Sequence, residues 1–523
     1  MTGDTPLYIF NNMKNLFHIV LVLFLSKSAA YCQKENYIWV NGHDSFSSNP
    51  IFGGINIDFN GDTVQAIKID RFIDFGKGND ASICDSSGQL LFYSNGCFIA
   101  NKENQLMENG DSLNSGEVYN SYCGDESLGY TSGFQSSIIL PLPASDSLYY
   151  LFHKRIFLFF NPFDVKTLNL LYSLVDISRN NGLGKVIEKN KIALQDTLSF
   201  GEMTAVRHAN GVDWWLVSPG DRNNKYFIFS FTQNGLALAH TQILGDTTPP
   251  AGEGGGYAIF NPDGSKYIRF NPHNKVRMFD FDRNTGLLSN YQHIDVDFGD
   301  SEPFDGGCLI SPSGQFLYIS VKRYLYQMDL WSDNIEASQV LVGTYDGYAD
   351  PLVANFGRGL LGPDCKLYVF PGNDTRVIHV IHNPNEPGLA CNFEQHALHT
   401  PTYHGATFPN FPDFRLKALG EPVSPCEGYT VGIRDVALHA LPVVSVYPNP
   451  ADTYLHIAVR EPLSAPAHWV LYDLYGRAVR SMLLVAGSER WQSDIAGLPA
   501  GVYAWQLSGS GIGSVGGKIV RSR

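Results

Sequence analysis

Short runs of apolar and aromatic residues alternate with turn residues along most of the chain. Runs such as LYYLF, YFIFSF and QFLYISV combine β-branched and aromatic side chains, and Gly, Asn, Asp and Pro bound them. Long stretches with apolar residues at helical spacing are absent from the sequence. The pattern therefore predicts an all-β protein, and 523 residues are enough for at least two folded units.

One phrase recurs, namely an apolar strand, a turn rich in Pro, Asp, Ser and Gly, and an aromatic strand. Weaker copies begin at Ala144 and His208, and clear copies are ICDSSGQLLFYSNG from Ile83, IFNPDGSKYIRFN from Ile259, LISPSGQFLYISV from Leu309 and LLGPDCKLYVFPG from Leu360. Copies about fifty to sixty-five residues apart are typical of propeller blades, whose sheets bury both faces against their neighbours. We expect a β-propeller over residues 33–416.

Counting the copies together with IFGGINIDF from Ile51 predicts seven blades, with six or eight as alternatives. The first blade is expected to be completed from both ends of the chain. A pair of stacked β-sandwiches is the competing fold, but sandwiches do not require such self-similar turns.

Residues 443–523 predict a separate, small immunoglobulin-like β-sandwich. VYPNPADTYLHI places Pro448, Asn449 and Pro450 in a stiff turn before a half-buried strand. Further on, DLYG turns at Gly476, Gly501 leads into the strand VYAWQL, and Lys518 lies in GGKIVRSR. Basic residues outnumber acidic ones here, against a net charge of −14 for the whole chain, which supports a domain boundary. The proline-containing residues 417–442 are expected to be a linker.

The N-terminus has the order of a secretory signal. From Met13, the expected true start, a lysine precedes an apolar run and then small residues at Ser28, Ala29 and Ala30. A membrane anchor is the alternative, but the run is about half of the ~20 residues that a spanning helix needs. We expect residues 1–32 to be removed by cleavage between Cys32 and Gln33, or else after Ala30. A lipidated Cys32 is disfavoured by the bulky Tyr31 before it.

Seven cysteines remain after the signal, scattered through a large domain. No CxxC pair exists, so a zinc site built from cysteines is not expected. Cys84 and Cys97 lie near neighbouring strands of one predicted hairpin, which makes them the expected local disulfide, although sequence alone does not fix the pairing.

Candidate chemistry is sparse. The negative net charge and the absence of a basic run argue against nucleic acid as a partner. No GxSxG elbow, P-loop, HExxH helix or dinucleotide fingerprint occurs, so we assign no catalytic, cofactor-binding or metal-binding residue and expect no cofactor.

Two clusters of side chains are candidate metal sites. Histidines gather at His379, His382, His396, His399 and His404, but a spacing of three puts the first two on opposite faces of a strand. Carboxylates gather at Asp295, Asp297, Asp300 and Glu302, but without the spacing of a calcium loop. We expect rim or core histidines and a solvated acidic loop.

Several phrases support a family resemblance. FGGINIDF, ASICDSSGQLLFYSNG, QSSIILPLP, SPSGQFLYIS, LYQMDL and HNPNEPGLACNF followed by FPNF resemble, over residues 37–416, the propeller of many secreted Bacteroidetes proteins. Departures are Cys365, where the repeated turn usually has glycine, and the insert that begins at Ser115. VYPNPADTYLHI, LYDLYGRAV, IAGLPAGVYAWQL and GGKIVRSR resemble the type A C-terminal sorting domain of the type IX secretion system, with an ordinary accessory domain as the alternative.

The second resemblance implies recognition at the outer membrane, export by way of the periplasm, and removal of the tail by a sortase-like protease that can join the cargo to surface lipopolysaccharide. A secreted or surface-displayed protein without a transmembrane span is therefore expected. Two functions remain open: a binding module for a glycan or protein, which we favour, and a glycan hydrolase or lyase with acids lining the propeller channel. Converging carboxylates of perturbed pKa at an open channel would favour the enzyme.

Overall fold

The structure of the chain is a computed structural model, and it describes residues 33–75, 80–124, 129–161, 163–246, 256–299, 305–421, 425–426, 444–459, 462–463, 466–473, 477–509 and 513–522. They form two compact units. The first comprises the residues up to Leu360 and Tyr368–Glu421, and the second comprises Leu361–Leu367 and Pro422–Arg523. Among the described residues, no helix is long and apolar enough to cross a membrane.

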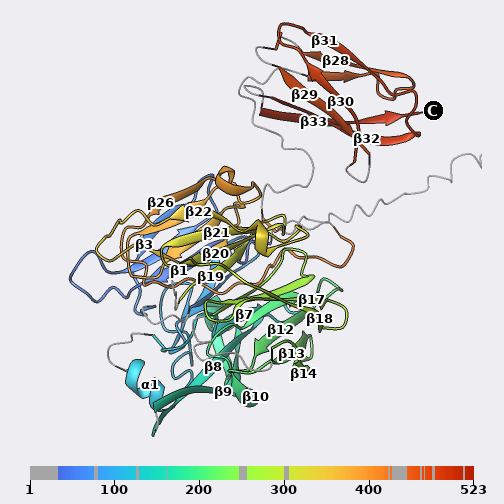
Figure 1. The fold of residues 1–523 in the computed structure, drawn as a ribbon. Coiled ribbons are helices and arrows are strands. Elements are labelled where there is room, and N and C mark those ends of the chain that lie inside the picture. Colours follow the sequence, from blue (N-terminus) through green and yellow to red (C-terminus); the bar gives the residue numbers. More distant parts are fainter. Residues whose placement is uncertain are drawn as a thin grey trace, which may run out of the picture. The chain divides into compact units, whose positions relative to one another are not determined.

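The described part of the first unit forms seven antiparallel sheets of consecutive strands (Figure 1). Two sheets have three strands. The first holds β1 (Ile38–Gly42), β2 (Gly54–Asp58) and β3 (Gln65–Ile69), and the second holds β4 (Ala81–Cys84), β5 (Leu90–Ser94) and β6 (Ile99–Asn101). The four-stranded sheets are β7 (Ser137–Pro141), β8 (Leu148–Phe160), β9 (Phe163–Asp176), β10 (Lys185–Leu198); β11 (Thr204–Arg207), β12 (Trp214–Pro219), β13 (Lys225–Thr232), β14 (Gly235–Ile243); β15 (Tyr257–Phe260), β16 (Lys266–Asn271), β17 (Lys275–Asp282), β18 (Leu287–Ile294); β19 (Gly307–Ile310), β20 (Phe316–Val321), β21 (Tyr324–Asp329), β22 (Val340–Thr344); and β23 (Phe356–Leu361), β24 (Leu367–Pro371), β25 (Val377–Ile381), β26 (Phe393–His399).

Among the residues described in this unit, helix occurs only in short pieces. They are α1 (Glu117–Tyr122), η1 (Asn180–Gly182), η3 (Glu336–Ser338) and η4 (Gly388–Cys391). The inner strands are buried on both faces, as β1, β4 and β19 show, whereas outer strands such as β3 are largely exposed. Radially stacked sheets with buried inner strands are the architecture of a β-propeller, so the predicted fold class is confirmed.

The repeated turns occupy equivalent places. The clear copies from Ile83, Ile259, Leu309 and Leu360 each form the turn between the first and second strand of the second, fifth, sixth and seventh sheet. Glycine takes a positive φ at the same turn position in three of them, at Gly88, Gly264 and Gly314. In the fourth copy Cys365 takes it instead, with φ 65°. Each repeated turn thus requires a residue with positive φ at this position, and Cys365 adopts it despite its Cβ.

The ring closes where the two ends of this unit meet. Trp39 of β1 packs against Tyr368 and Phe370 of β24, with ring centroids 5.4 and 6.2 Å apart. The backbone N–H of Gly42 donates to the carbonyl of His404 (3.1 Å), and the Asn41 side-chain amide donates to the Thr407 carbonyl. Residues 403–407 therefore cover the free side of β1. The expectation that strands from both chain ends complete the first sheet is wrong, because this sheet holds only β1, β2 and β3, and the C-terminal residues beside β1 are irregular.

Beyond Thr407 the chain continues into the middle of the propeller. Phe408 packs against Phe134, Tyr257 and Phe370, which belong to three different sheets or the residues before them, with ring centroids 5.1 to 5.9 Å apart. A residue can touch three blades at once only near the axis of the ring. We call residues 403–418 the central segment.

The central segment runs from one end of the inner strands to the other. Asn410 lies near their starts, where its side-chain amide donates to the carbonyls of Ser137 (3.0 Å) and Met203 (2.8 Å). Phe414 then packs against Trp214 of β12, and Leu419, just beyond the segment, donates its N–H to a carbonyl in the β11–β12 turn. The chain's own residues thus fill the centre of the ring.

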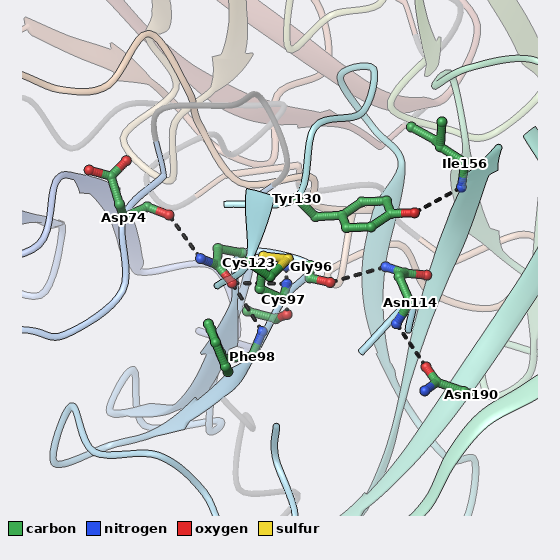
Figure 2. Close-up of a disulfide and its surroundings, with 11 residues drawn as sticks. Asp74, Gly96, Cys97, Phe98, Asn114, Cys123, Tyr130, Ile156 and Asn190 are labelled. Atoms are coloured by element: carbon green, nitrogen blue, oxygen red, sulfur yellow. Dashed lines mark hydrogen bonds between the residues drawn. A yellow bond between two sulfur atoms is a disulfide. The ribbon is translucent and has the colours of Figure 1, made fainter. Parts of the chain in front are cut away.

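The expected Cys84–Cys97 disulfide is wrong, because Cys97 pairs with Cys123 (Figure 2). Register explains the error: Cys84 pairs with Leu90 beside the β4–β5 turn, whereas Cys97 follows the other end of β5. Cys123 comes from the insert that begins at Ser115 and contains α1. The two cysteines of the prediction therefore lie at opposite ends of one hairpin.

Hydrogen bonds order the backbone around this disulfide. The Asn95 side-chain oxygen accepts from the N–H groups of Cys97 (3.0 Å) and Phe98 (3.1 Å), and Asn114 donates to the Gly96 carbonyl (Figure 2). A second disulfide joins Cys365 to Cys426. The thiols of Cys84, Cys308 and Cys391 are buried and free, and burial raises their pKa.

The second unit is a β-sandwich, as predicted. One sheet holds β27 (Val444–Tyr447), β28 (Tyr454–Val459) and β31 (Arg490–Asp494). The other holds β29 (Ala467–Tyr472), β30 (Ala478–Leu484), β32 (Gly501–Gly509) and β33 (Gly513–Arg521). Leu455, Trp469 and Leu507 are fully buried between them, and the alternation along β28 matches the half-buried strand expected there.

Replacing Asn410 with alanine tests the central segment. The Asn410→Ala variant leaves two buried carbonyls without their donor, so we expect a loss of about 2–4 kcal/mol in the free energy of unfolding, measured by urea denaturation. Asn234→Ala, on an exposed turn, is the matched control and should change it by less than about 0.5 kcal/mol. Equal losses in the two variants would contradict the proposed role of the segment.

Candidate functional site

The predicted sorting-domain residues only partly come together. Asn449 follows β27, and its side chain bonds the last strand twice: it donates to the Lys518 carbonyl (3.1 Å) and accepts from the Val520 N–H (2.8 Å). Pro448 and Pro450 flank it, and Gly501 opens β32. Gly476 and Cys32 lie outside the described residues, and Gln33 is the first residue described. Through these two hydrogen bonds, Asn449 of the motif joins the residues after the first strand of the sandwich to its last strand.

The five clustered histidines have different surroundings. His379 is buried against Phe356, and burial lowers its pKa to about 3. His404 is buried beside Thr375, and burial lowers its pKa to about 4. His382 pairs with Glu394 (2.8 Å), whereas His396 lies beside His379, their ring centroids 5.3 Å apart. His399 ends β26.

Neither cluster forms a recognisable ligand set. In the described part of the chain, no group of three or more His, Cys, Asp or Glu side chains has the arrangement of a metal site. Asp295 lies 3.8 Å from the Lys275 ammonium, and the Asp297 carboxylate accepts from Gly299 N–H (2.8 Å). Asp300 and Glu302 lie outside the described residues.

A histidine that the sequence did not single out lies between two carboxylates. His43 follows β1, its Nδ1 lies 2.8 Å from Asp74 and its Nε2 lies 2.7 Å from Asp374. Burial alone would lower the pKa of His43, but hydrogen bonds to the two carboxylates outweigh it and raise the pKa to about 10. The imidazolium is therefore held in its charged form.

The geometry of His43 points to a structural role. Asp74 precedes the second sheet, and Asp374 follows β24 of the seventh sheet while accepting from Gly405 N–H (2.9 Å) in the central segment. With both ring nitrogens occupied by carboxylates, His43 has no free nitrogen to act as a base. We therefore interpret this charge triplet as a clamp on the closure of the ring.

The central segment lies on the axis of the propeller, where the alternative enzyme site was expected. Asp413 is buried in the central segment, and burial raises its pKa to about 6 although Arg415, Arg207 and Arg283 oppose the shift. Glu35 is similarly buried near Arg207 and Arg415. Two carboxylates whose pKa is raised by burial thus lie close to the same arginines, Arg207 and Arg415.

A groove on the flank of the propeller is the candidate binding site. It has a volume of about 670 Å³ and lies between the fifth and sixth sheets. Its apolar floor includes Met278, Ile294 and Leu330. The polar lining residues are Asn261, Asp263, Ser265, Lys266, Gln292, His293, Ser332, Asp333, Asn334 and Glu336.

Trp331 dominates this groove because 67% of its surface is exposed. It sits in the loop between β21 and β22, which its own hydrogen bonds hold in shape. Asp329 accepts from Trp331 N–H (2.9 Å), and the Asn334 side-chain oxygen accepts from Ala337 N–H (3.0 Å). The indole is thus presented to solvent on an ordered loop, an arrangement suited to stacking.

The charges in the groove are mostly negative. Asp263, Asp333 and Glu336 line it, and the Lys266 ammonium is already paired with Asp280. Sequence reasoning missed this site, because its two walls come from separate stretches, residues 261–294 and 314–336, and no motif links them. The available signal was a tryptophan in the polar, turn-like stretch WSDN.

Comparison with known families identifies the second unit. Residues 445–521 match the secretion system C-terminal sorting domain. The match confirms the resemblance seen in the tail, and it implies that secretion machinery handles this chain. Among curated proteins, no sequence matches the chain.

Solved structures resemble this chain at low sequence identity and low TM-score. A protein from Lactobacillus plantarum is 11% identical, with a TM-score of 0.39 over 71% of this chain and 98% of its own. A putative 6-phosphogluconolactonase from Bacteroides fragilis is also 11% identical, with a TM-score of 0.40 over 72% and 97%. The Dos1 propeller is 13% identical, with a TM-score of 0.31 over 60% and 70%.

The clamp at His43 predicts a specific pH dependence of stability. Because the folded pKa, about 10, lies above the unfolded value of 6.5, the stabilisation is complete below pH 6.5 and falls as the pH rises toward 10. His43→Gln, which removes the charge, should flatten the decline in unfolding free energy between these pH values. Urea denaturation across this range measures it, and parallel profiles for the two proteins would refute the clamp.

Proposed function

We propose that this protein is an exported seven-bladed propeller, one blade per sheet, that binds carbohydrate in the groove beside Trp331. The observation that carries the proposal is an exposed indole on an ordered loop, at the edge of a groove lined by carboxylate, amide and hydroxyl groups. A sugar ring has an apolar face that stacks on an aromatic side chain and equatorial hydroxyls that bond to such polar groups. The groove supplies both kinds of contact.

The negative charges of the groove disfavour acidic glycans as ligands. Asp263, Asp333 and Glu336 would repel uronate or sulfate groups, since the lysine of the groove is already paired. Neutral sugars and amino sugars remain suitable. We therefore propose a neutral or amino-sugar polysaccharide as the ligand.

Export follows from the second unit. The sorting domain supports delivery by the type IX secretion machinery, in the manner of the Bacteroidetes proteins that the sequence resembles, with a sortase-like protease as a second partner. Cleavage within the linker 417–442, on the C-terminal side of the disulfide-bonded Cys426, would separate the propeller from the tail. The mature protein would then be released or held at the cell surface.

Trp331 provides the direct test of binding. We expect the full chain to bind neutral or amino-sugar polysaccharides on a glycan array. Trp331→Ala should raise the dissociation constant at least about tenfold, which corresponds to ~1.4 kcal/mol of binding free energy. Phe46→Ala is the matched control, because Phe46 is 76% exposed and lies outside the groove.

Two results would count against the groove. Equal affinity of Trp331→Ala and the parent chain would place the ligand elsewhere, and absence of any glycan signal would favour a protein ligand. Cleavage of the bound polysaccharide would instead favour the hydrolase or lyase alternative.

The tail generates a separate prediction. A chain truncated after Pro442 should fold its propeller but remain in the periplasm, because only the sorting domain contacts the export machinery. Fusing residues 443–523 and a signal peptide to an unrelated cargo should export that cargo from a type IX-competent host. Immunoblots of periplasmic and external fractions measure both, and surface delivery of the truncated chain would refute the assignment.

A further inference from the structure

The hairpin of β8 and β9 extends past both of its neighbours. β7 pairs with β8 only as far as His153, and β10 pairs with β9 only from Thr167 onward. From Ile156 to Phe160 and from Phe163 to Lys166 the two strands therefore form a ribbon with which no further strand of the described residues pairs. Figure 1 shows the long strands β8, β9 and β10 beside α1. We call the outer end of this ribbon the tip.

The tip exposes three phenylalanines. Phe159, Phe160 and Phe163 are 42%, 66% and 68% exposed, and Phe160 lies directly opposite Phe163 with ring centroids 6.2 Å apart. Closer to the body, Ile156 is instead buried beside α1 and the Cys97–Cys123 disulfide. The ribbon is thus packed at its base and bare at its end. A cluster of exposed aromatic rings at one point marks an interaction surface.

The charges around the tip differ in sign from those of the chain. Arg155, Lys166 and Arg222 lie on the ribbon or bond to it, and Asp164 sits 3.5 Å from both the Lys166 and the Arg222 side chains. Asp221, 3.7 Å from Arg222, is the other carboxylate of this group. Cations therefore outnumber carboxylates here, although the net charge of the chain is −14.

We propose that the tip docks on an anionic phospholipid bilayer. The rings of a phenylalanine cluster carry no hydroxyl or indole N–H and partition readily below the headgroups of a membrane. Arginine and lysine beside the rings complement the negative surface of such a bilayer, which would otherwise repel this acidic chain. The tip and the groove at Trp331 belong to different sheets, so this surface is independent of carbohydrate binding.

Vesicle binding tests the proposal. The full chain should co-sediment with phosphatidylcholine vesicles that contain about one third phosphatidylglycerol, and less with phosphatidylcholine alone. The double variant Phe160→Ser with Phe163→Ser should lower the partition coefficient at least about tenfold. Phe46→Ser, at an equally exposed phenylalanine away from the ribbon, should leave it unchanged.

Depth of insertion gives an independent readout. In a Phe160→Trp variant, brominated lipids should quench the added fluorescence, while the quenching of the parent chain stays small. The proposal is overturned if the parent chain does not bind anionic vesicles, or if the double variant binds as well as the Phe46→Ser control. Because all the substituted side chains are exposed, unchanged thermal unfolding should accompany each result.

Discussion

The fold depends on one constraint, which is that a ring of sheets must be joined to itself. Each sheet buries both faces against its neighbours, so an open seam would expose two apolar faces at once. Here the seam is joined by rings of β1 and β24, by His43 held between two carboxylates, and by backbone bonds to the central segment. Packing provides the area of contact at the seam, and the charged contacts fix its register.

The central segment links this closure to function. Phe408, Asn410 and Phe414 occupy the axis, which is the place considered for an enzymatic site. The two binding surfaces proposed here lie on the outside of the ring, in a groove between sheets and on strands that extend past their neighbours. Both surfaces described above, the groove at Trp331 and the phenylalanine tip, have this peripheral character.

Much of the architecture could be predicted because it repeats or alternates. The glycine-containing turns fixed the positions of the inner hairpins, and the half-buried pattern of β28 identified the sandwich. The features that could not be predicted depend on contacts between residues that are far apart in the sequence. Cys97 meets Cys123 through an irregular insert, His43 meets Asp374 across most of the chain, and no periodicity precedes either contact. The groove escaped prediction for the same reason, since its walls meet only after the sheets have packed.

The place of the central segment also bears on how long the protein lasts outside the cell. A carboxypeptidase that trims inward from the linker would first meet Cys426, which a disulfide joins to Cys365. With that bond reduced it would reach Leu416, which is 2% exposed, and could go further only if the ring opened. Its rate would then be set by the unfolding of the whole propeller rather than by fraying of an end. Loss of the tail would thus leave a cargo with a protected terminus, and its resistance to extracellular proteolysis would be a property of ring opening.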